Sequence, residues 1–196
     1  FKPIAVVSIA GYDQLLTVAD MAGQLGENPN FKPIVEQLVL AMTQGEGLKG
    51  LDSTRPLGVV MIASQSSGAM GGYALIPTTD YDDLLDLVGS FGLLQKAFNG
   101  TATLTVGDNT VHIRSWKNWA VVALDPAMLD RTSDNAVSAV QTMVRHYDIS
   151  AQVMASNIPP MYKQVFQMGV NSAYQEAQRS AEFQAMSPEE QAGYLT

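Results

Sequence analysis

Short runs of β-branched and aliphatic residues, each closed off by proline, glycine or serine, punctuate the first half of the chain. Residues 4–10 read IAVVSIA and residues 57–63 read LGVVMIA. Apolar runs of this length between turn residues are typical of buried strands. Between them lie two longer segments, 11–25 and 31–43, whose apolar residues recur at helical spacing. The chain is thereby constrained to an architecture that mixes strands with helices.

The same signals extend along the rest of the chain. A third strand is predicted over 73–77, a helix from Asp80 to about residue 91, and a strand over 101–106. The order β-α-α-β-β-α-β resembles a ferredoxin-like split βαβ with one extra helix. Hairpin strands (111–116 and 119–124), a short helix after Asp125, a helix (136–146), a strand (148–156) and a final helix (to about 183) are expected to follow.

We therefore expect an α+β fold. Its sheet is mixed but mainly antiparallel, with helices on one face. It starts as a split βαβ and ends in hairpins and a long C-terminal helix. The 196 residues suit one domain, which we place at 1–185. Residues 186–196 form a polar tail in which Ser187 and Pro188 are expected to start a last short helix.

Two strand-to-helix junctions share a local pattern. Tyr12-Asp13 and Tyr81-Asp82 each follow a predicted strand, and each is followed by one further residue and a pair of leucines. Two interpretations remain open. The pattern reflects an internal repeat, or it reflects the general preference of such junctions for aspartate caps and apolar pairs, with Asp13 capping the first helix.

Charge and composition exclude several classes of partner. The net charge is −8 and the pI about 4.5, so nucleic acid and anionic membrane surfaces are poor partners. No apolar run approaches the length of about 18 residues that a membrane span needs. The absence of cysteine removes disulfides, thiol nucleophiles and cysteine-ligated zinc.

No catalytic motif is present, and we expect a non-enzymatic protein without cofactor or metal. His112 and His146 stand outside any metal-binding helix pattern, and residues 68–72 lack the lysine of a phosphate-binding loop. An acidic cluster could hold a cation, but helix capping explains it more simply; its members are Asp80, Asp82, Asp83 and Asp86. An enzyme using paired carboxylates, such as Asp80 or Asp52 with a neighbour, is the weaker alternative.

The hairpin around Lys117-Asn118 gives the sharpest local inference. A two-residue turn sets Trp116 opposite Trp119, and alternation places Arg114 and His112 on the same face with the threonines at 101, 103 and 105. The other face, with Val111, Ile113, Val122 and Leu124, makes the better core. The candidate partner-binding residues are Trp116, Trp119, Arg114 and His112. The plainer alternative is a tryptophan pair that staples the hairpin or lies under the final helix.

Five segments resemble a family of uncharacterised bacterial exported proteins. They are FKPIAVVSIAGYDQLL, GLKGLDSTRPLGVV, YALIPTTDYDDLL, NWAVVALDPAML and YDISAQVMASNIPPMY, all within residues 1–165. In that family such segments follow a signal peptide, so the resemblance implies a periplasmic, cell-envelope or extracellular location. It implies no activity and no catalytic residues.

Two function classes follow. The first is a non-enzymatic exported or envelope protein that acts by binding another protein or by forming a homodimer, for which the tryptophan face and the final helix are the candidate surfaces. The second is a carrier of a small apolar ligand with a pocket between the helices and the sheet.

Overall fold

The computed structural model describes residues 1–28, 30–97, 100–145 and 147–180. Its strands are β1 (Lys2–Ile9), β2 (Leu57–Ala63), β3 (Met70–Pro77), β4 (Leu93–Lys96), β5 (Thr101–Val106), β6 (Asn109–Trp116), β7 (Trp119–Ala123) and β8 (Ile149–Val153). Its helices are α1 (Tyr12–Leu25), α2 (Phe31–Met42), α3 (Tyr81–Gly89), α4 (Asp134–Met143) and α5 (Pro160–Arg179), with short 3-10 turns η1 (Pro126–Arg131) and η2 (Ala155–Asn157). His146 and the predicted tail, 186–196, lie outside the described residues.

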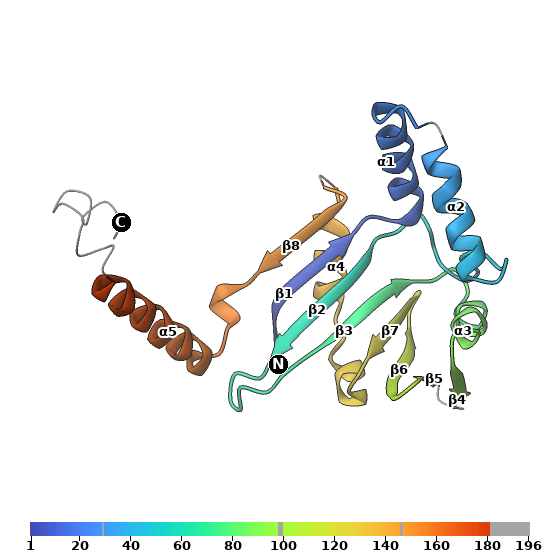
Figure 1. Cartoon of the computed structure of the whole chain (residues 1–196). Helices are drawn as coiled ribbons and strands as arrows, with labels where there is room; N and C mark the ends of the chain where they lie inside the picture. Colours follow the sequence, from blue (N-terminus) through green and yellow to red (C-terminus); the bar gives the residue numbers. More distant parts are fainter. Residues whose placement is uncertain (29, 98–99, 146, 181–196) are drawn as a thin grey trace.

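The strands form one eight-stranded sheet in the order β4-β5-β6-β7-β3-β2-β1-β8 (Figure 1). Each described pairing is antiparallel. The predicted α+β class, the mainly antiparallel sheet and the long C-terminal helix are therefore confirmed. None of the described helices is long and apolar enough to cross a membrane.

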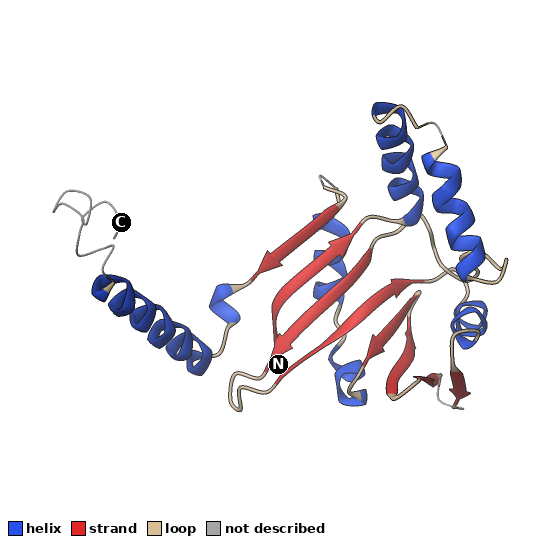
Figure 2. Ribbon diagram, viewed as in Figure 1, coloured by secondary structure: helices blue, strands red, loops and turns tan. Residues whose placement is uncertain are grey.

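The expected split βαβ is not formed. In that motif two parallel strands leave room for a third between them, whereas β1 pairs directly with β2 in the antiparallel direction. The two helices between them explain this result. α1 and α2 pack mainly on each other as an antiparallel hairpin beyond the end of the sheet (Figure 2). The chain therefore returns to the sheet where it left, and β2 runs back beside β1.

Helices cover both faces of the sheet rather than the one face predicted. Alternation along β7 shows the division: Trp119 and Val121 join the main core with α4 and η1, while Ala120 joins a second core under α3. The main core also uses Val60, Leu75 and Val140. α4 lies behind β1 and β2 in the view of Figure 1, and α3 packs on β4 and β5 at the other end of the sheet.

The two junctions with the shared tyrosine–aspartate pattern begin helices at equivalent points but pack differently. α3 starts at Tyr81 with Asp80 as N-cap, whose carboxylate accepts a hydrogen bond from the Asp83 amide. α1 starts at Tyr12, and Gly11 rather than Asp13 occupies its N-cap. The expectation that Asp13 caps the first helix is therefore wrong, because Asp13 lies inside the first turn of α1 and the residue before Tyr12 is a glycine.

Two helical parts stand away from the sheet. No residue of α2 and none of α5 is buried. α5 extends beyond β8, the edge strand, and points away from the other elements (Figure 1). A helix that is amphipathic yet unburied lacks the packing that normally stabilises it.

Candidate functional site

The predicted hairpin register is confirmed, and one of the two tryptophans on this face is a core residue. Trp116 pairs with Trp119 and His112 with Ala123, as the two-residue turn requires. Trp119 is only 2% exposed and belongs to the main core. The covering elements are α4 and η1, not the final helix. Trp119 is thus a core residue rather than part of a surface, because the chain after β7 folds back over this face.

Two cations lie on the tryptophan rings. The Arg55 guanidinium lies 4.2 Å from the centre of the Trp119 ring, and the Lys117 ammonium lies 4.6 Å from that of Trp116. Such contacts stabilise a ring that is partly desolvated. Trp116 is half-buried at the edge of the same core. The tryptophan pair therefore fixes the hairpin to its neighbours, which is the plainer of the two interpretations.

The other two candidates, His112 and Arg114, line a small polar cavity of about 410 Å³ together with Thr103 and Asp130. The Arg114 guanidinium donates to the Asp130 carboxylate and to the Leu129 carbonyl. Both acceptors belong to η1, so Arg114 holds η1 against the sheet. Its charge is already neutralised, which leaves the cavity weakly equipped to attract an anion.

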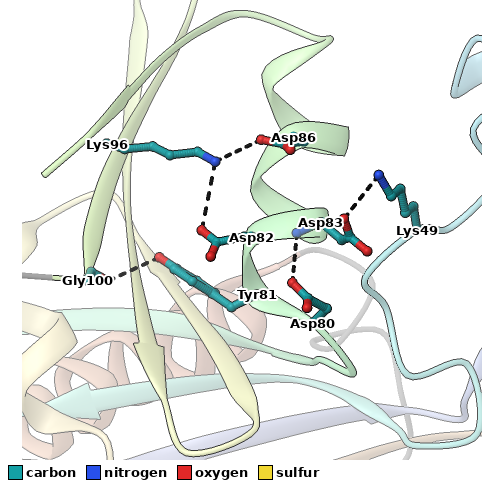
Figure 3. Close-up of polar contacts among 8 residues, drawn as sticks. All are labelled: Lys49, Asp80, Tyr81, Asp82, Asp83, Asp86, Lys96 and Gly100. Atoms are coloured by element: carbon teal, nitrogen blue, oxygen red, sulfur yellow. Dashed lines mark hydrogen bonds and ion pairs between the residues drawn. The ribbon is translucent and has the colours of Figure 1, made fainter. Parts of the chain in front are cut away.

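The acidic cluster at the start of α3 is paired with two lysines, Lys49 and Lys96, rather than arranged around a cation (Figure 3). Asp86 accepts a hydrogen bond from Lys96 at 2.8 Å, and Asp83 pairs with Lys49 at 3.0 Å. The hydrogen bond from Lys96 lowers the pKa of Asp86, and the same bond raises that of Lys96. Among the described residues no group of three or more acidic or histidine side chains could hold a metal ion.

Asp52 and Asp80, the candidates for carboxylate chemistry, both have structural partners. Asp52 accepts hydrogen bonds from the amide and the hydroxyl of Thr54, which fixes the turn before β2. Asp80 caps α3. Each carboxylate thus shapes a chain turn, and no step of a reaction is assigned to either.

Two tyrosines provide a pH-dependent test of the described packing. Burial raises the pKa of Tyr73 to about 12; burial, and then the charge of Asp82, raise that of Tyr81 to about 12. The Tyr81 hydroxyl also donates to the Gly100 carbonyl (Figure 3). Because the folded state holds these protons more tightly than an unfolded chain with pKa about 10, their contribution to stability is complete below pH 10. It is lost as the pH rises toward 12.

In an absorbance titration of the folded chain, we expect Tyr73 and Tyr81 to ionise near pH 12. Tyr81→Phe and Tyr73→Phe should each remove one of the late ionisations, which assigns them. If neither substitution removes an ionisation near pH 12, these two side chains are not buried as described.

An apolar sheet surface is the feature that sequence reasoning missed. On the face opposite α4, no described helix covers β8, β1, β2 and the first half of β3. This open face includes Val59, Met61 and Met70, which are 43–48% exposed, and Ile149 and Val153, each 67% exposed. The pairing of Ala5 with both Met61 and Val153 shows that these strands present one continuous surface. The run LGVVMIA predicts cover on both faces, but it cannot say what provides the cover.

A groove runs along the open face over β3. Its volume is about 500 Å³. Gly72 and Ala74 form a low floor, with Val59 and Met61 on one side and Val122 on the other. The walls are aliphatic, and Asp125 is the one charged residue among those that line it. The shape and chemistry suit an apolar ridge rather than a polar ligand.

A second apolar surface lies on α5. Its exposed side chains include Val165, Phe166 and Val170, which are 49–74% exposed. The opposite stripe of the helix consists of uncharged amides: Gln164, Gln167, Asn171, Gln175 and Gln178. Beside the start of α5, an apolar cavity of about 660 Å³ is lined by Ile158, Tyr162 and Phe166, among others. The amphipathic pattern indicates a helix that is covered on one side in the working protein.

No protein-family model, curated protein or solved structure matches this chain. Function is therefore inferred from the two apolar surfaces, the open face and α5. Three of the residues predicted to bind a partner have structural contacts instead: Arg114, Trp116 and Trp119.

Proposed function

We propose that this is a non-enzymatic protein that acts by association with protein surfaces, in the first place with a second copy of itself, through the open face. The observation that carries this proposal is the exposure of Val59 and Met61 on β2, an interior strand of the sheet whose other side is the main core. Exposed apolar patches of this kind mark interaction surfaces on folded proteins.

A comparison within the same sheet supports the proposal. β5 alternates threonine with apolar residues, and its threonines lie on the less covered side. Antiparallel strands with one wet face normally show this alternation. β2 has no polar residue on either face, although Val59 and Met61 are exposed. The sequence of β2 therefore suits a sheet that is covered on both sides.

We propose an exported location because five segments of the chain resemble segments of exported bacterial proteins. On this proposal the chain associates in the periplasm, in the cell envelope or outside the cell. The absence of cysteine fits a protein that needs no disulfide, because its two cores supply the packing.

Carriage of a small apolar ligand is the second candidate. The observation that favours it is the cavity of about 660 Å³ beside α5, whose size suits a drug-sized or acyl ligand. This cavity lies between η2 and α5 rather than between the helices and the sheet. Co-purification of one apolar molecule in stoichiometric amount would support the carrier over the association surface.

The association is tested by placing a charge on the open face. We expect the wild-type chain to form a concentration-dependent dimer in light scattering. Met61→Lys should weaken the dimer at least about tenfold, because an unpaired ammonium would be buried in the interface. Gln152→Lys is the matched control: Gln152 is exposed and pairs with Val6, so it faces the other side of the sheet.

The control variant should associate as the wild type does. A wild-type chain that stays monomeric across the concentration series contradicts the proposal. Equal weakening by both substitutions would also contradict it, because charge alone would then explain the effect.

A further inference from the structure

We propose that α5 of one copy lies in the open-face groove of a second copy, and that the second copy returns its own α5 in the same way. The inference rests on the proposed self-association and names what covers the open face. The result is a twofold dimer with two equivalent helix-in-groove contacts. The tethering of α5, the shape of the groove, the contact size and the charges each support it.

The apolar face of α5 needs to be covered by another surface. Its apolar residues recur at three- and four-residue spacing, from Tyr162 and Phe166 through Ala173. Phe166 is 74% exposed although it lies in the middle of this face. A solitary helix in water with this pattern is marginal, because most helix stability in proteins comes from packing an apolar face.

The start of α5 is fixed in position by contacts with the rest of the chain. The Tyr162 hydroxyl donates to the Gly68 carbonyl at 2.8 Å, and Met161 packs against Gly68. Just before the helix, the Asn157 side chain donates to the Pro3 carbonyl at 2.7 Å. These contacts fix α5 at the β2–β3 hairpin. From there it leads away from its own sheet (Figure 1).

The apolar face of α5 and the groove have complementary shapes. The lining of the groove includes Gly72 and Ala74 of β3, which have little or no side chain. The apolar face of α5 offers bulky side chains, of which Phe166 is 74% and Val165 60% exposed. Large residues entering a channel floored by small ones give the close packing that a stable contact needs.

The area of the proposed contact favours two reciprocal contacts over one. A 20-residue helix is about 30 Å long and about 10 Å wide, so its footprint is roughly 300 Å². Two reciprocal contacts, counted on both partners, cover on the order of 1,200 Å², the lower end of the range for stable interfaces. One contact alone covers half of that. The reciprocal arrangement is therefore favoured over capture of a single helix.

The charges of α5 and of the groove are complementary. α5 carries Lys163 and Arg179 against one acid, Glu176, in a chain whose net charge is −8. The charged residue that lines the groove is acidic, Asp125. A weakly basic helix entering an acidic body meets attraction rather than the repulsion that two acidic surfaces would give.

The test uses the absence of cysteine in the natural chain. Ala74→Cys marks the groove floor, and Ala173→Cys marks the apolar face of α5. Chains carrying one or the other are given tags of different size, co-expressed, and oxidised. We expect one disulfide-linked species that contains both tags, because the bond forms only when the two Cβ atoms come within about 4.5 Å. Asn171→Cys, on the amide stripe of α5, is the matched control and should yield less than about a tenth as much.

The alternatives give different products, and each overturns the inference. A bond between two Ala173→Cys chains means that the helices pair with each other. An internal bond in a chain with both cysteines means that α5 folds back on its own groove. If Ala74→Cys does not fold, Val59→Cys on the groove wall replaces it. A dimer in light scattering that gives no groove-to-helix bond from either position leaves the association intact and rejects α5 as the occupant. A monomer rejects the association itself.

Discussion

Replacing Trp119 with alanine is expected to lower the free energy of unfolding by about 3–5 kcal/mol. The ring is 2% exposed, lies in the main core and is covered by the Arg55 guanidinium. The substitution leaves a cavity and also removes a cation–π contact. Because a domain of this size has about 5–15 kcal/mol of stability in all, the variant should unfold at a much lower urea concentration, as measured by circular dichroism.

Trp116→Ala is the matched control on the same hairpin. Trp116 is half-buried and lies at the edge of the core under Lys117. Its removal should cost less than about 2 kcal/mol, because less area returns to water. Equal losses for the two tryptophans would contradict the division of the pair into one core residue and one boundary residue.

Gly50→Ala should cost about 3–4 kcal/mol, an effect almost as large. Gly50 has a φ of +75°, and an added Cβ would lie 2.2 Å from the Leu84 amide nitrogen and 2.5 Å from the Asp80 carbonyl oxygen. The left-handed backbone costs an alanine about 1–2 kcal/mol, and moving the start of α3 adds about 1–3 kcal/mol. Thermal unfolding followed by circular dichroism measures the loss.

Gly45→Ala separates the cost of the left-handed backbone from the cost of moving the start of α3. Gly45 also has a positive φ, +90°, but a Cβ there would meet nothing within 4 Å. Its substitution should therefore show the backbone cost alone, about 1–2 kcal/mol. Similar losses at the two glycines would mean that α3 gives way to the new methyl group without strain.

The sequence predicted local structure well where one pattern decides it. β2 and β5 have the predicted bounds, 57–63 and 101–106, because turn residues close both runs. The register of the β6–β7 hairpin follows from its two-residue turn. β4 was missed, since LLQK is short and lies at the sheet edge without alternation. β3 starts at Met70 rather than at residue 73, because its first residues are paired glycines and a methionine that carry no strand signal.

The candidate site was predicted less well, because exposure depends on what folds over a strand. The hairpin pattern correctly grouped Trp116, Trp119, Arg114 and His112 on one face. It could not show that η1 and α4 return over that face, a long-range contact that no local pattern encodes. The face with Val111 and Ile113 was expected to be the better core, yet both faces are core, under different helices. For the same reason the exposure of the open face could not be predicted from β2, whose uniformly apolar sequence is typical of a strand buried on both sides.

The position of β1 between β2 and β8 also constrains how the chain is made. β1 spans residues 2–9 and its outer neighbour, β8, spans residues 149–153, so one edge of β1 stays open until that later segment has left the ribosome. Closing a loop of this length is slow compared with forming a local hairpin such as β6–β7. During that interval β1 presents unpaired amides and carbonyls to other nascent chains. Pairing of β8 is thus the late step that closes the sheet and brings the start of α5 to the β2–β3 hairpin.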